Sequence, residues 1–158
     1  MNKRVVHLNL NVLLVILLVA SAIVSAYLVL HMQGVYSVLR EYNSRTALVQ
    51  SDMNDMSAFV QEWKIAVSYS ETYQNHPYLK LISDSYNSKL PMVKQHLLDY
   101  RDFVGKNSAL LVSVSINAPL EIKNIDSLLE AYDKNVGDFS AYLQRLQAAQ
   151  QNVTAPSG

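Results

Sequence analysis

The chain has 158 residues, which is room for one domain of modest size. Its 13 Lys and Arg balance 13 Asp and Glu, and only 16% of its residues are charged, against about 25% in an average soluble protein. This deficit suggests that part of the chain does not meet water. The absence of cysteine excludes a disulfide framework, a thiolate zinc site and a cysteine nucleophile, and four Gly and four Pro argue against a turn-rich all-β fold.

The charge deficit is concentrated near the start of the chain. After Lys3 and Arg4, the next charged residue is Arg40. Residues 12–30 are aliphatic apart from Ser21, Ser25 and Tyr27. As a helix, this run of 19 residues spans roughly 28 Å, close to the thickness of the bilayer hydrocarbon. We therefore predict a single transmembrane helix over residues 12–32.

The flanking charges predict how this helix is oriented. Lys3 and Arg4 precede it, so the positive-inside rule leaves residues 1–11 as a short cytoplasmic N-terminus of a cell-membrane protein. The rest of the chain is then periplasmic or extracellular. A cleaved signal peptide is the alternative, because Ala20–Ala22 and Val24–Ala26 offer small residues to a signal peptidase. Signal peptides usually have an apolar region of only 7–15 residues, so we favour an uncleaved anchor.

A heptad pattern begins just after the predicted span. Apolar or aromatic residues alternate at spacings of four and three, with Thr46 as the polar exception, at Val35, Leu39, Tyr42, Thr46, Val49, Met53, Met56, Val60, Trp63 and Val67. This spacing predicts a coiled-coil-like helix over residues 35–74, with Gly34 as a possible joint to the span. Thr46 is either solvated or a polar residue that fixes the register of the seam.

A second helical pattern follows a break at Pro77. It comprises Leu79, Ile82, Tyr86, Leu90, Val93, Leu97, Tyr100 and Val104. The register slips beside Pro91, which predicts either a kink or two helices, the second capped by Asn87 or Ser88. Gly105 is the predicted C-terminal stop.

A third pattern starts near Asn117 and alternates threes and fours. Its members are Ile122, Ile125, Leu129, Tyr132, Val136, Phe139, Leu143 and Leu146. The pattern fades from Gln147, and residues 151–158 are expected to form a flexible tail.

Three apolar seams must cover one another. We therefore predict an all-α fold, in which the N-terminal transmembrane helix continues into an extracytoplasmic antiparallel bundle of three to four helices over residues 33–150.

Two regions are candidate partner contacts. Aromatic residues crowd around the turn at Pro77, namely Tyr69, Tyr73, His76 and Tyr78. Tyrosine is enriched at protein interfaces, although Tyr69 and Tyr86 also fit ordinary core positions.

The second candidate region is an uncharged run beyond Gly105. It contains Leu110, Leu111, Val112, Val114 and Ile116. A short fourth helix or strand packed on the bundle base is one interpretation, and the alternation over residues 112–116 fits a strand. The other is a loop that touches the membrane interface or a neighbouring subunit.

Signals for chemistry are few. His96 and Asp99 share a helix face, but one His and one Asp are half a metal site at best, and we expect a solvated surface pair. Asp52 and Asp55 fit a solvated acidic face. We predict no catalytic residues, no metal site and no cofactor.

Charge also bears on the partners. Beyond residue 32 the chain carries 11 Lys and Arg against 13 Asp and Glu, because only Lys3 and Arg4 precede it, and it has no basic patch for nucleic acid. The expected partners are the lipid bilayer and other protein subunits, in a homo- or hetero-oligomer. The sequence thus favours a non-catalytic, membrane-anchored accessory subunit over an enzyme. The alternative is a ligand-sensing helical bundle that acts through a partner.

Overall fold

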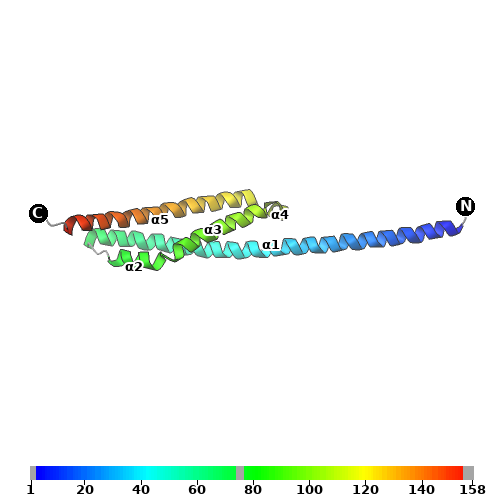
Figure 1. Cartoon of the computed structure of the whole chain (residues 1–158), viewed down its shortest axis with the longest axis horizontal. Coiled ribbons are helices and arrows are strands. Elements are labelled where there is room, and N and C mark those ends of the chain that lie inside the picture. Colours follow the sequence, from blue (N-terminus) through cyan, green and yellow to red (C-terminus); the bar gives the residue numbers. More distant parts are fainter. Residues whose placement is uncertain (1–2, 74–76, 155–158) are drawn as a thin grey trace. The chain divides into compact units, whose positions relative to one another are not determined.

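The computed structural model describes residues 3–73 and 77–154, with side chains over residues 12–69 and 77–149. This part of the chain forms five helices and no strand, as Figure 1 shows. They are α1 (Lys3–Tyr73), α2 (Pro77–Tyr86), α3 (Lys89–Lys106), α4 (Ser108–Ser113) and α5 (Ala118–Thr154). The prediction of an all-helical chain is confirmed. The chain divides into two compact units, Met1–Glu41 and Tyr42–Gly158.

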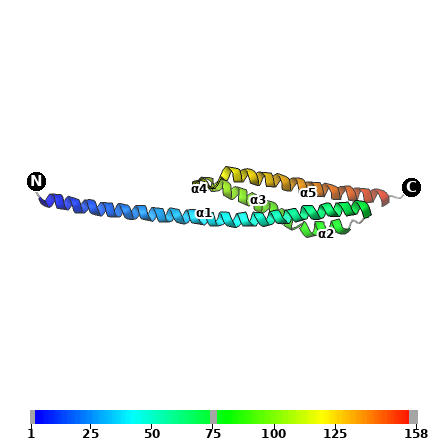
Figure 2. The ribbon, with the colours of Figure 1, turned by 180° about the vertical axis from the view of Figure 1, so that it is seen from behind.

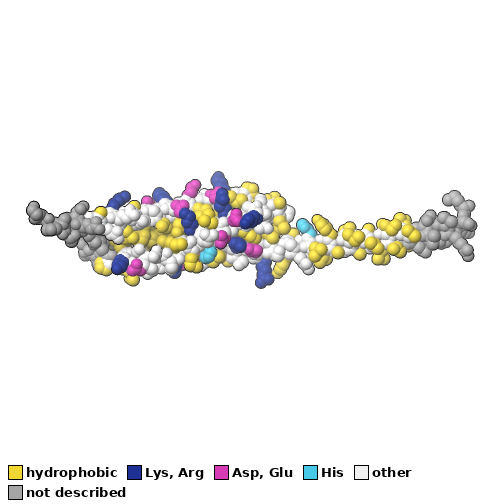
Figure 3. Space-filling view, in the orientation of Figure 1, with side chains coloured by type: hydrophobic (Ala, Val, Ile, Leu, Met, Phe, Trp, Pro, Cys, Tyr) yellow, Lys and Arg dark blue, Asp and Glu magenta, His cyan; other side chains and the backbone are white. Residues whose placement is uncertain are grey.

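The first unit consists of α1 up to Glu41. From Val12 to Leu30, every large apolar side chain is between 52% and 71% exposed, and Figure 3 shows hydrophobic side chains along the part of this helix that is drawn in colour. Within the described residues, α1 is the one helix long and apolar enough to cross a membrane. Gly34 lies inside α1 and makes no break, because glycine costs a helix only about 1 kcal/mol and the neighbouring residues favour helix.

The second unit consists of the rest of α1 packed with α2, α3, α4 and α5. Contacts between side chains give the directions of the helices. Tyr42 pairs with Glu121 and Phe59 with Phe139, so α1 and α5 run in the same direction. Thr46 pairs with Tyr100 and Phe59 with Tyr86, so α2 and α3 run against α1. α3 and α5 lie side by side, as Figures 1 and 2 show in views from opposite sides of the molecule.

An aromatic cluster forms the centre of this core. Phe59 is fully buried, and its ring centroid lies 5.1 Å from those of both Tyr86 and Phe139. The ring centroid of Trp63 lies 5.8 Å from that of Phe139. Tilted and edge-on ring pairs of this kind add about 0.5–1.5 kcal/mol each to the free energy of burial. The cluster therefore holds α1, α2 and α5 together.

The heptad seam predicted for α1 is displaced by one position along part of the helix. The buried side chains of α1 are Val49, Asp52, Met56, Phe59 and Ala66. Three predicted members, Met53, Val60 and Val67, are only half-buried, and Thr46 is exposed. The reason is that α1 packs against α2 and α3 on one side and α5 on the other. Its buried stripe is therefore wider than the two-position seam of a simple coiled coil.

All eight positions predicted for the second seam are buried, and its break produces two helices. Ser88 occupies the N-cap position of α3, but its side chain makes no capping hydrogen bond. Pro91 lies in the first turn of α3, where its missing N–H leaves no helical hydrogen bond unmade. Gly105 is not the stop that was predicted. The helix continues to Lys106 and ends at Asn107, whose side-chain amide donates to the Phe103 carbonyl at 2.9 Å.

The uncharged run beyond α3 is helical, so the strand interpretation is wrong. α4 buries Leu111 completely and is followed by a left-handed residue, Ser115, with φ of 67°. The Ile116 N–H donates to the Leu111 carbonyl at 2.9 Å and the Ser115 N–H to the Val112 carbonyl at 3.0 Å. These two bonds are a Schellman motif, which terminates the helix.

α5 begins where the sequence predicts and extends further than its pattern. Asn117 Oδ1 accepts a hydrogen bond from the Leu120 N–H at 3.2 Å, as an N-cap residue does. The helix then continues past Gln147 to Thr154, so the first half of the expected tail is helical. Residues 155–158 lie outside the described part of the chain.

Candidate contact surfaces

Only some of the tyrosines predicted to form a contact surface near Pro77 are exposed. Tyr69 is 57% exposed and Tyr78 is 45% exposed, so both present rings to solvent. Tyr86 is buried against Phe59, as its core interpretation requires. For Tyr69 the core interpretation is wrong. The side chain of Tyr73 and all of His76 lie outside the described residues.

The run after Gly105 divides between core and surface. Leu111 is fully buried, Leu110, Val114 and Ile116 are half-buried, and Val112 is exposed. Val112 and Ile116 line a shallow hollow together with Ser115, Asn117 and Pro119. The interpretation as a short fourth helix accounts for Leu111, whereas the side chain of Val112 is exposed.

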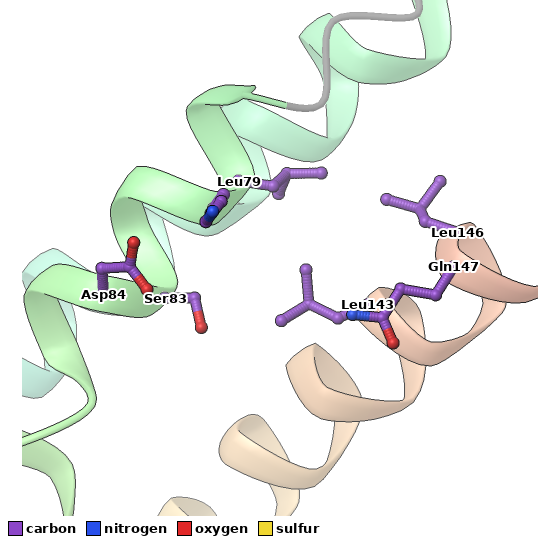
Figure 4. A pocket seen from close by; sticks show the side chains of 7 residues that line it. Leu79, Ser83, Asp84, Leu143, Leu146 and Gln147 are labelled. Carbon is purple, nitrogen blue, oxygen red and sulfur yellow. The ribbon is translucent and has the colours of Figure 1, made fainter. Parts of the chain in front are cut away.

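A groove that the sequence did not predict lies between α2 and α5. Its volume is about 450 Å³, and Figure 4 shows Leu79 of α2 facing Leu143 and Leu146 of α5 across it. Its remaining lining residues are polar, namely Lys80, Ser83, Asp84 and Gln147. The slip of register between Tyr86 and Val93 was the available signal, because the helix breaks between α2 and α3 and α2 no longer has to follow α5.

A buried carboxylate replaces the expected acidic face. Asp52 is only 8% exposed, and its Oδ2 lies 3.0 Å from Nδ1 of His96 on α3. The expected solvated face is therefore wrong for Asp52, although Asp55 is exposed. His96 does not pair with Asp99, which instead accepts a hydrogen bond from Gln95 Nε2 at 2.7 Å. The spacing on one helix could not reveal this, because the partner comes from another helix.

A second polar contact joins α1 to its neighbours. The Thr46 hydroxyl lies 3.0 Å from the Tyr100 hydroxyl, and Tyr42 donates to Glu121 at 3.2 Å. Burial raises the pKa of Tyr100 well above its ordinary value, and the hydrogen bond between its hydroxyl and that of Thr46 only partly opposes this effect. Thr46 is thus both exposed and engaged across the helices, which is consistent with a residue that fixes register.

Charged pairs on the surface link α3 to α5. Lys94 contacts Asp133 and Arg101 contacts Asp126, each at 2.6 Å. Exposed pairs of this kind contribute only about 0–1 kcal/mol each to stability. Their main effect is therefore to favour one alignment of α3 with α5. Among the residues with described side chains, no group of three or more His, Asp or Glu is arranged to hold a metal ion.

Over residues 3–73 and 77–154 the chain is all-helical, and one of its helices is long and apolar enough to span a bilayer. Comparison with known proteins adds no family or relative: no family model, no curated protein and no solved structure matches the chain.

Proposed function

We propose that this chain is a non-catalytic accessory subunit of a membrane protein assembly. Residues 12–32 anchor it, and its extracytoplasmic helical bundle packs against other chains. The observation that carries the proposal is the continuous exposure of aliphatic side chains from Val12 to Leu30. Apolar surface of this extent is strongly unfavourable in water, and a lipid bilayer covers it completely.

The orientation in the proposal comes from charge. Lys3 and Arg4 are the basic residues nearest to one end of the span, and Arg40 is the first beyond the other end. Basic residues close to a span are retained in the cytoplasm, so the N-terminus is inside and the second unit is outside.

The partner surface in the proposal is the apolar and aromatic part of the second unit that stays exposed. It comprises Tyr69 and Tyr78 near the turn, and Val112 and Leu120 around the end of α4. Tyrosine is enriched in protein interfaces, and the buried centre of an interface is more apolar than its rim.

Extraction of the full chain in mild detergent tests this proposal. Light scattering on the purified particle should give a protein mass well above the 17.8 kDa of one chain, with a fixed stoichiometry. Val112→Lys should dissociate the complex, because a lysine in the centre of an interface is left unpaired and desolvated. Ser113→Lys, at the neighbouring exposed position, is the matched control and should leave the complex intact. A monomer without any bound protein would contradict the proposal.

The groove between α2 and α5 favours a second candidate function, ligand sensing through a partner. Its volume lies within the usual range of small-molecule sites, and it combines three leucines with polar groups at its edge. A panel of water-soluble aromatic amines and carboxylates should then raise the urea midpoint of the wild-type chain. Ser83→Trp, which fills the groove, should abolish the increase. If no compound changes the midpoint, or if the increase persists in Ser83→Trp, sensing through this groove is wrong.

A further inference from the structure

The aliphatic surface of α1 gives way to a different kind of surface just beyond Leu30. The residues that follow are His31, Met32 and Gln33, and the next charged residue is Arg40. The helix continues through all of them, so every backbone group in this stretch keeps its hydrogen bond. A continuous helix can therefore pass from hydrocarbon to water here without exposing unpaired backbone to lipid.

Helix geometry limits where the hydrocarbon ends. A core about 30 Å thick accommodates about 20 residues at 1.5 Å each. On the N-terminal side, Asn11 is the last polar residue before the aliphatic run. Counting about 20 residues from it reaches His31. The far boundary of the hydrocarbon should therefore lie close to Met32 and Gln33.

Side-chain direction then selects the residue that reaches the headgroups. Side chains on a helix lean toward its N-terminus, so at this end of the span they lean back toward the hydrocarbon. Tyr36 is 71% exposed and lies just beyond the boundary, so its ring can lean back to the level of the headgroups. Tyr27 lies below the boundary, where its ring stacks on His31 with centroids 6.2 Å apart and planes 6° apart.

A shallow hollow on one face of α1 spans this boundary. Val29, Met32, Gln33 and Tyr36 line it, and they are spaced by three, one and three residues, so they share one side of the helix. Its surface is almost entirely apolar, so Gln33 and Tyr36 face it with their carbon atoms and not with their polar ends. An apolar hollow at this level fits the part of a phospholipid acyl chain nearest its ester group, and Gln33 and Tyr36 are the lining residues on the headgroup side.

We propose that the distal boundary of the bilayer lies at Met32–Gln33 and that this hollow seats a glycerophospholipid. The acyl chain lies on Val29 and Met32. The Gln33 amide and the Tyr36 hydroxyl donate hydrogen bonds to ester and phosphate oxygens. Aromatic residues at this level are the usual interfacial anchors of membrane helices, and they set how deep the helix lies. The inference rests on the membrane anchoring in the proposed function.

The cysteine-free sequence permits a direct test of the boundary. Single cysteines replace Val24, Leu28, Tyr36 or Arg40 in the full chain, which is placed in phosphatidylcholine nanodiscs with both faces open to reagent. A membrane-impermeant maleimide should label cysteines at positions 36 and 40. It should label cysteines at positions 24 and 28 only after detergent is added. If positions 24 and 28 are labelled without detergent, both this inference and the anchoring fail. If they are protected but position 36 is protected too, only the boundary is wrong.

Fluorescence quenching tests the lipid contact itself. Tyr36→Trp is made together with Trp63→Phe, so that the only tryptophan is at position 36. Phosphatidylcholine brominated close to the ester groups should quench its emission more strongly than lipid brominated near the methyl ends. Stronger quenching by the deeper bromines, or no quenching by either lipid, would overturn the inference.

Discussion

The displaced seam of α1 gives the sharpest test of the packing. Phe59 and Val60 are neighbours on the same helix, and the heptad pattern assigns Val60 to the core, whereas the structure buries Phe59 completely. Truncating each side chain to alanine therefore measures which of the two positions faces the centre of the second unit.

The expected losses differ several-fold. Phe59→Ala removes a ring that packs within 5.1 Å of both Tyr86 and Phe139, and large-to-small changes at such sites cost about 3–5 kcal/mol. Val60→Ala removes two methyl groups, each worth about 0.8 kcal/mol when fully buried. Because Val60 is only half-buried, the expected loss is about half of their sum, or about 0.8 kcal/mol. With a urea slope of about 1–3 kcal/mol/M, the midpoint falls by about 2 M for Phe59→Ala and by about 0.4 M for Val60→Ala.

The single tryptophan provides the assay. Trp63 packs on Phe139 in the second unit, so its fluorescence reports unfolding of that unit and not of the aliphatic part of α1. Urea titrations of the full chain in non-ionic detergent micelles give the midpoint and slope of each variant. Ile65→Ala, at an exposed position of α1, is the control and should change the midpoint little. Equal losses for Phe59→Ala and Val60→Ala, or a larger loss for Val60→Ala, would refute the observed register.

Three further predictions use the same assay. His96→Ala should lower the free energy of unfolding by about 2–3 kcal/mol, because it leaves the Asp52 carboxylate buried without its partner. In a double-mutant cycle with Asp52→Ala the two losses should not be additive, and strict additivity would contradict the pairing of these side chains. Ser115→Gly should stabilise the second unit by about 0.5–1 kcal/mol, because glycine adopts the φ of 67° at this position without strain. The control Ser127→Gly, within α5, should destabilise the unit by about 0.5 kcal/mol, and a loss of stability in both variants would show that Ser115 is unstrained. Burial raises the pKa of Tyr100, and of Tyr86 and Tyr132, above the ordinary value of 10.0, so above pH 10 the unfolded chain loses protons that the folded form retains. The urea midpoint should therefore fall as the pH rises above 10, and a midpoint that stays level or rises there would be inconsistent with burial of these hydroxyls.

Helix positions were largely predictable because they depend on neighbours in sequence. The spacing of Leu79, Ile82 and Tyr86 and of the later seam positions placed the second seam correctly, and each of its eight members is buried. The break near Pro91 was also legible, since proline constrains its own backbone whatever surrounds it. The stop predicted at Gly105 lies one residue before the observed end of α3, because the turn closes at Asn107, whose side-chain amide donates to the Phe103 carbonyl.

Contacts between helices were not predictable in the same way. Asp52 appeared to belong to a solvated face, yet it is buried beside His96. The groove lined by Leu79, Leu143 and Leu146 likewise required knowledge of how far α2 diverges from α5. In each case the partner lies more than 40 positions away, so no local spacing connects the two residues.

For this chain, local chemistry is sufficient to specify helices and an apolar stretch long enough for a bilayer, because helical hydrogen bonds close within four residues and hydrophobicity is a property of each side chain. Which side of each helix is buried depended on the arrangement of the other helices. α1 buries Phe59 rather than Val60 because it meets neighbours on two sides, and that arrangement exists only once the second unit has packed.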